Sequence, residues 1–175
     1  MLILGNLFSL IASIFLLSST FTKSKKSLVK LQIGDTGSNV VANLLLGGIS
    51  GAVVSAFGLI RNLLVYSKKG TKVLYSIVIA SMVFTSIVFN NRGVVGLLPI
   101  FASAVYSITM CKESSSAISM KKALIINVSA WLIYNVTILA IPSVISNLTV
   151  LLSTIYNLVK STDTDNLAHN GPTTD

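Results

Sequence analysis

Apolar stretches fill most of the chain and are separated by short polar or basic breaks. A helix needs about 20 apolar residues to cross the hydrocarbon core of a bilayer, and the stretches have about that length. The runs 28–66 and 123–159 are each too long for one span, so each is expected to fold as a hairpin. We therefore predict seven membrane helices, over about 2–19, 28–48, 49–66, 73–89, 94–111, 123–140 and, after the turn at Pro142, up to about 159.

The composition agrees with this pattern. The 175 residues are 53% hydrophobic and 10% charged, whereas a soluble domain has about 25% charged residues. We expect an all-α, polytopic membrane protein with a single helical domain over 1–160. The segment 161–175 is polar and is predicted to be a disordered tail. The single Cys111 excludes a disulfide within the chain.

The basic residues indicate topology rather than a nucleic-acid partner. Of the 13 Lys and Arg residues, only Arg92 falls outside the set of breaks that would lie on one side of the membrane. Cytoplasmic loops carry an excess of Lys and Arg. This bias predicts a bacterial inner-membrane protein with its N-terminus outside and its C-terminus in the cytoplasm.

A polar stripe runs along the second predicted helix. Gln32, Asp35, Asn39 and Asn43 follow one another at spacings of three, four and four, which places all four on one face of a helix. Polar residues inside a span usually face the interior of the bundle or a water-filled cavity. The stripe predicts such a surface.

Asp35 and Arg61 form a candidate ion pair or gate. At about 1.5 Å per residue, Asp35 lies roughly 10 Å from the start of its helix, where a charge costs about 2.5–3.5 kcal/mol on insertion scales. Both residues lie 13 positions from Gly48, so an antiparallel hairpin turning there would bring them to equal depth. The pair could open during transport, or it could be a static clasp.

The two halves of the chain show a weak internal repeat. A shift of 94 pairs Ser9 with Ser103 and Ser13 with Ser107, a shift of 92 pairs Asn43 with Asn135, and a shift of 95 pairs Asn62 with Asn157. Related pairs are Gly5 with Pro99, Asp35 with Asn127, and Asn39 with Trp131. This pattern predicts two parallel triplets of helices, 1–67 and 94–160, joined by a linker helix over 73–89.

The chain resembles the YgjV-type bacterial inner-membrane proteins and, more distantly, the SWEET and PQ-loop transporters. The residues that carry the resemblance are Lys30-Leu31-Gln32, Leu45-Leu46-Gly47, Ile60-Arg61-Asn62-Leu63 and Leu97-Leu98-Pro99. The YgjV resemblance implies a location in the inner membrane. The SWEET similarity implies a 3+1+3 helix arrangement and facilitated passage of a small polar solute between the triplets.

Amides recur at related positions in both halves and are the candidate solute ligands. An amide offers both a hydrogen-bond donor and an acceptor, which suits a hydroxyl-rich solute such as a sugar, and an indole could stack on a sugar ring. The alternative is that the amides join helices to one another, at about 0.6 kcal/mol each. The candidates are Asn39, Asn43, Asn62, Asn127, Trp131, Asn135 and Asn157.

No catalytic constellation, metal-ligand cluster or phosphate-binding loop stands out, so we expect neither an enzyme nor a cofactor. The expected partners are the lipid bilayer, a small polar solute and, in a homo-oligomer, further copies of the chain. Two functions compete. A SWEET-like carrier predicts that the amides converge on one cavity between the triplets, and a non-transporting assembly or accessory protein predicts that they bond pairwise around a filled centre.

Overall fold

The computed structural model describes residues 1–22, 25–111 and 117–169. Within these residues the chain is all-helical, as predicted. The seven helices are α1 (Leu2–Thr20), α2 (Lys25–Leu45), α3 (Ile49–Tyr66), α4 (Lys72–Val88), α5 (Gly93–Cys111), α6 (Ala117–Thr137) and α7 (Ile141–His169).

The helices have the length of membrane helices, and they expose apolar side chains while burying polar ones. Among the described residues, three stretches are long and apolar enough to cross a bilayer, and α4 and part of α5 are shorter apolar helices. The three stretches are Leu2–Ser19, Ile49–Tyr66 and Ile141–Val159. Large apolar side chains such as Ile3 (88% exposed) and Phe84 (73% exposed) cover the outside, while serines are buried within. This is a polytopic membrane protein.

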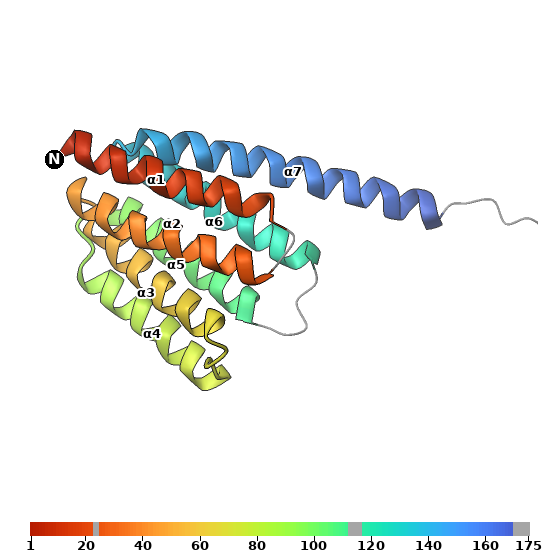
Figure 1. Cartoon of the computed structure of the whole chain (residues 1–175), viewed down its shortest axis with the longest axis horizontal. Coiled ribbons are helices and arrows are strands. Elements are labelled where there is room, and N and C mark those ends of the chain that lie inside the picture. Colours follow the sequence, from red (N-terminus) through yellow and green to blue (C-terminus); the bar gives the residue numbers. More distant parts are fainter. Residues whose placement is uncertain (23–24, 112–116, 170–175) are drawn as a thin grey trace, which may run out of the picture.

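Three helices have bounds that differ from the prediction. α2 begins earlier, at Lys25, and ends earlier, at Leu45, while α6 begins at Ala117, so lysines that were predicted to lie in loops belong to the helices. Lysine is a good helix former, and its long side chain can reach the polar boundary from within a helix. α7 continues to His169, past the end predicted near residue 159. Residues 161–169, predicted to be disordered, are therefore helical and project beyond the bundle (Figure 1).

Six of the described helices form a ring, and α4 lies outside this ring, at the edge of the bundle (Figure 1). Going around the ring, each helix contacts the next in the order α1, α2, α3, α5, α6, α7 and back to α1. α4 packs against α3 and α5. The predicted triplets thus meet at two interfaces, α3 with α5 and α1 with α7, and the predicted linker helix packs against the first of these.

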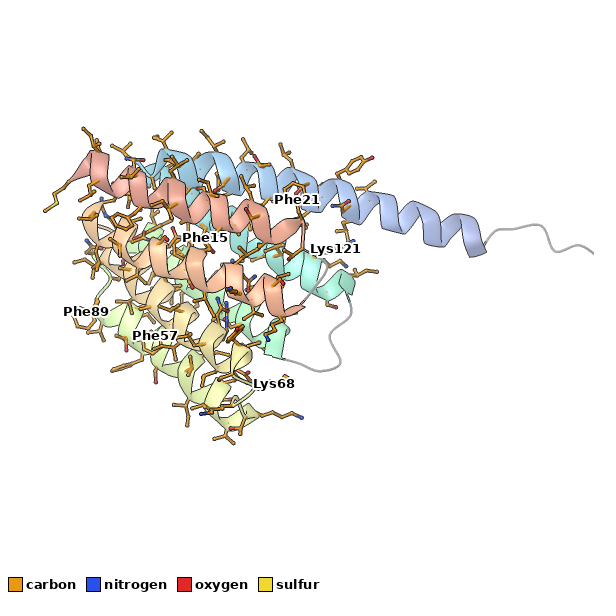
Figure 2. All side chains as sticks on the ribbon, viewed as in Figure 1. Phe15, Phe21, Phe57, Lys68, Phe89 and Lys121 are labelled. Atoms are coloured by element: carbon orange, nitrogen blue, oxygen red, sulfur yellow. The ribbon has the colours of Figure 1, made fainter. Side chains whose placement is uncertain are left out.

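Helices that follow one another along the chain alternate in direction, and the loops at the two ends of the bundle differ in chemistry. The basic end carries Lys26, Lys30, Lys68, Lys69, Lys72, Lys121 and Lys122. Figure 2 shows Lys68 and Lys121 at this end and Phe89 at the other. We call the other the hairpin end, because it contains the α2–α3 and α6–α7 turns together with the α4–α5 loop.

The two turns at the hairpin end have the same hydrogen bonds at a spacing of 92 residues. In the first turn the amides of Leu46, Gly47 and Gly48 donate to the carbonyls of Ala42, Leu44 and Asn43. The amides of Ile138, Leu139 and Ala140 donate to Tyr134, Val136 and Asn135 in the same way. Gly47 and Leu139 also share a positive φ, 73° and 59°. The sequence offset of 92 thus extends from the helices into the turns.

The α1–α7 interface is a line of short polar side chains. Ser9 Oγ lies 2.7 Å from Ser143 Oγ, and Ser13 Oγ lies 3.1 Å from Ser146 Oγ. The first turn of α7 is held as well, since the amide of Ile141 donates to the side-chain oxygen of Asn6. Small residues let helix backbones approach closely in a membrane, so this interface is tight.

Candidate functional site

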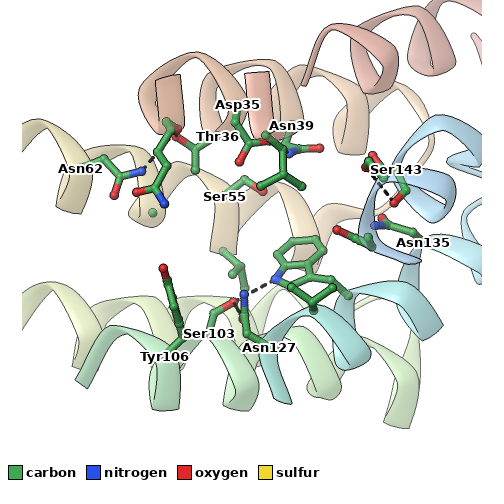
Figure 3. Close-up of a pocket in the computed structure, with 18 of the residues that line it drawn as sticks. Asp35, Thr36, Asn39, Ser55, Asn62, Ser103, Tyr106, Asn127, Asn135 and Ser143 are labelled. Atoms are coloured by element: carbon green, nitrogen blue, oxygen red, sulfur yellow. Dashed lines mark hydrogen bonds between the residues drawn. The ribbon is translucent and has the colours of Figure 1, made fainter. Parts of the chain in front are cut away.

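A polar cavity of about 130 Å³ lies inside the ring of helices (Figure 3). Every one of the seven described helices contributes to its wall. Figure 3 shows Asp35 and Asn39 on one side and Ser103, Tyr106 and Asn127 facing them. An apolar cavity of about 150 Å³ holds a molecule the size of benzene, so this cavity can hold a small polar molecule or several waters.

Most of the residues predicted from the sequence line this one cavity. They come from both triplets and from three helices, α2, α3 and α6. The lining residues that were predicted are Asp35, Asn39, Arg61, Asn62, Asn127, Trp131 and Asn135.

Two predicted ligands lie elsewhere. Asn43 is 2% exposed and buried at the hairpin end, where its Nδ2 donates to the carbonyl of Asn39 at 2.8 Å. Asn157 is exposed on α7, and its carbonyl accepts a hydrogen bond from Lys121. The spacing of 92 that holds through the turns would pair Asn62 with Thr154, which is also buried. The shift of 95 that selected Asn157 therefore points to the outer face of α7.

Asp35 and Arg61 line the same cavity, each with partners of its own. Asp35 Oδ1 accepts a hydrogen bond of 2.8 Å from Asn39 Nδ2, one turn further along α2. Arg61 is 8% exposed, and its Nη1 donates to Ser107 Oγ at 2.5 Å. Its guanidinium also lies over the Tyr106 ring, 5.6 Å from the ring centre. The burial shows that Arg61 does not reach out to the membrane surface.

Arg61 is further held by its neighbour in sequence. Its Nε and Nη2 both donate to Asn62 Oδ1, at 3.3 and 3.1 Å. Asn62 in turn donates to the carbonyl of Gln32 on α2, at 3.4 Å. These contacts join α3 to both α2 and α5 at the depth of the cavity. The ion pair between Arg61 and Asp35 stays a prediction.

Trp131 is fixed at the cavity wall by a short polar chain. Its indole Nε1 donates to Ser103 Oγ at 3.0 Å, and that hydroxyl donates to Asn127 Oδ1 at 3.1 Å. On the other side, the Trp131 and Tyr134 rings meet edge to face with centroids 5.7 Å apart. The single tryptophan of the chain is therefore held in one orientation.

Several lining residues were not among the predicted ligands. They are mostly hydroxyl-bearing or small, and such residues carry no individual signal in a membrane sequence. A usable signal is the spacing of 92, which pairs Ser55 of α3 with Asn147 of α7. The additional polar lining residues are Ser13, Gln32, Thr36, Ser55, Ser103, Tyr106, Ser143, Ser146 and Asn147.

Apolar packing closes the ring at the hairpin end. Leu46, Tyr134, Ile138 and Ala140 form a buried cluster, with Val95 and Trp131 packed against it. Tyr134 is fully buried at its centre. The cavity lies next to this cluster, and Trp131 contributes to both.

The chemistry of the cavity is that of hydrogen bonding. Amides, hydroxyls, one acid and one guanidinium line a small space together with apolar side chains such as Leu16, Val54 and Met82, and each polar type can bind a polar solute in place of its water. Across the described ranges 1–22, 25–111 and 117–169, no group of three or more His, Cys, Asp or Glu residues could hold a metal ion.

Comparison with known proteins bears on identity. No curated protein and no solved structure matches the chain. The model of the Imp-YgjV family, described as bacterial inner membrane protein, matches residues 3–165. The match spans all seven helices, so the resemblance seen in the sequence is confirmed: the chain belongs to the YgjV family of bacterial inner membrane proteins.

Proposed function

We propose that this inner-membrane protein is a facilitative carrier for a small polar solute, in the manner of SWEET transporters. The observation that carries the proposal is the convergence of amides and hydroxyls from both triplets on one cavity. Side chains that served only to join helices would bond pairwise and leave a filled centre. The cavity is the feature that favours transport over an accessory role.

The arrangement of the helices supports a rocking mechanism. The triplets α1–α3 and α5–α7 meet at two interfaces with the cavity between them. Movement of one triplet against the other would expose the cavity alternately to the two sides of the membrane. The concentration of lysines at one end supports an orientation with the basic end in the cytoplasm.

The carrier proposal also assigns roles to the polar side chains. Asn127 and Asn135 project from α6 and Asn39 from α2, so a solute between them would be bound by both triplets at once. Trp131, held edge-on by Ser103, would offer a flat surface beside them. A neutral solute with several hydroxyl or amide groups fits this lining.

Solute permeation through reconstituted protein tests the proposal. Proteoliposomes would be exposed to osmotic steps of glycerol, xylitol, glucose and urea, and the rate of volume recovery followed by stopped-flow light scattering. We expect faster recovery than in protein-free liposomes for at least one solute, lost in Asn135→Leu and retained in Asn157→Leu, whose site is exposed. Equal recovery with and without protein for all four solutes would contradict transport of this class of solute.

A further inference from the structure

The hairpin end contains a side chain seated in a notch of the opposite triplet. Tyr134 of α6 reaches the start of α3, where the amide of Gly51 donates to its hydroxyl oxygen at 3.0 Å and Ser50 Oγ donates at 3.4 Å. The first amides of a helix have no partner within the helix. Tyr134 therefore caps α3 from another triplet.

The notch exists because residue 51 has no side chain. A Cβ atom at Gly51 would lie 2.6 Å from Tyr134 Cε1 and 2.6 Å from Asn43 Oδ1. Ring and amide thus press against the same stretch of α3 backbone. Both are almost completely buried, Tyr134 at 0% and Asn43 at 2% exposure. The fit is closed.

Asn43 contributes a polar side to this contact. Its Oδ1 is buried without a hydrogen-bond partner among the described residues, close to the Tyr134 hydroxyl, whose own proton needs an acceptor. A hydrogen bond between them, directly or through one water, would satisfy both atoms. The amide that the polar stripe places deepest on α2 thus serves the closure and not the cavity.

The notch is not reproduced in the other half of the chain. At the spacing of 92, the counterpart of Tyr134 is Ala42, and the counterparts of Gly48 and Gly51 are Ala140 and Ser143. A two-fold arrangement would otherwise place two such contacts at this end. The Tyr134 side chain therefore closes the helix bundle at this end without a counterpart from the other triplet.

We propose that Tyr134, seated on Gly51 beside Asn43, is the gate that separates the cavity from the hairpin end of the bundle. The gate rests on the proposed function only in that a carrier must open it during each cycle. Its opening requires the ring to leave the notch, which breaks the bonds to Ser50 and Gly51 and separates α6 from α3.

Thiol accessibility tests the gate without any solute. In a Cys111→Ser background, Ser55→Cys places a reporter on the cavity wall, and Lys68→Cys identifies the membrane face of the basic end. A membrane-impermeant methanethiosulfonate reagent is then applied from the opposite face, using right-side-out and inverted vesicles. The modification rate at position 55 is compared between parent, Tyr134→Ala and Gly51→Ala, with Ile133→Ala and Gly37→Ala as controls.

The controls match the test variants closely. Ile133 is the neighbour of Tyr134 on α6 and is 51% exposed. A Cβ at Gly37 meets nothing within 4 Å. Gly51→Ala expels the ring without removing it, so it tests the gate even where Tyr134→Ala does not assemble.

We expect slow modification from the hairpin face in the parent and a rise of at least about tenfold in Tyr134→Ala and Gly51→Ala, as the loss of two hydrogen bonds allows. The two controls should leave the rate unchanged. Fast modification in the parent, or no rise in either test variant, would overturn the gate. The modification rate does not depend on solute uptake. A failure of the carrier proposal would appear in the light-scattering experiment and not in this one.

Discussion

Replacing Gly51 by alanine is predicted to destabilise the bundle, although alanine is the better helix former. The added methyl carbon would lie 2.6 Å from Tyr134 Cε1 and from Asn43 Oδ1. Overfilling a packed core typically costs about 1–3 kcal/mol, and the burial of both neighbours favours the upper half of this range. The gain in helix propensity is about 0.5–1 kcal/mol. We therefore expect a net loss of about 1–2 kcal/mol in the free energy of unfolding.

Unfolding in mixed micelles of dodecyl maltoside and SDS can measure this loss. Trp131 is the only tryptophan of the chain and lies edge to face with Tyr134, so its fluorescence reports on the contact directly. Gly37→Ala is the control, because it gains the same helix propensity and meets no atom within 4 Å. Equal stability of Gly51→Ala and Gly37→Ala would refute the seating of Tyr134 in the notch.

Three further substitutions test other contacts of the bundle. Ser9→Ala leaves the buried amide of Ser143 without its acceptor and should lower the free energy of unfolding in the same assay by about 1–2 kcal/mol; an unchanged value would contradict this bond. Arg61→Lys keeps the charge but cannot bond Asn62 Oδ1 through two nitrogens, so we expect a loss of about 2 kcal/mol, and parental stability would show that charge alone suffices. Arg92→Ala removes bonds to the carbonyls of Leu46 and Gly47 in the α2–α3 turn together with a positive charge at the end of α2, a loss of about 1 kcal/mol. Faster hydrogen exchange at the turn amides would show it, and unchanged exchange would count against the cap.

The polar stripe shows how far sequence reasoning reaches. Helical spacing alone was enough to place Gln32, Asp35 and Asn39 on a common face, and all three line the cavity. Asn43 continues the same spacing, yet it lies beyond the cavity, in contact with the hairpin-end closure. Periodicity fixes the face of a helix and not the depth at which a neighbouring helix closes over it.

The contacts of Arg61 mark a second limit. Equal distance from the turn predicted that Arg61 and Asp35 lie close to each other, and both line the cavity. The choice of partner depends on which helix follows α3 around the ring. That helix is α5, which brings Ser107 and Tyr106 to the guanidinium, and no local pattern in the sequence specifies the order of helices in the ring.

The helical membrane class was recoverable because long apolar runs leave few alternatives, whereas the family was suggested only by the resemblance of a few short motifs. The repeat was harder to follow, because the offset was read from single residues. The turn hydrogen bonds show an offset of 92. At this offset the residue that corresponds to Asn62 is buried Thr154 and not exposed Asn157. A change of three residues in register rotates a side chain by about 60° and moves it about 4.5 Å along the helix, which here is the step from buried Thr154 to exposed Asn157.

The two interfaces between the triplets are built from unlike contacts, and this has a mechanical consequence. Between α1 and α7, hydroxyl pairs at 2.7 and 3.1 Å cease to be hydrogen bonds once the helices part by about an ångström. At the α3–α5 interface, the Arg61 guanidinium bonds Ser107 and lies over the Tyr106 ring, and at the hairpin end the Tyr134 ring of α6 rests on the α3 backbone at Gly51. The Tyr134 contact at the hairpin end is the one that can be released while the α1–α7 hydroxyl pairs and the Arg61 contacts between α3 and α5 stay in place.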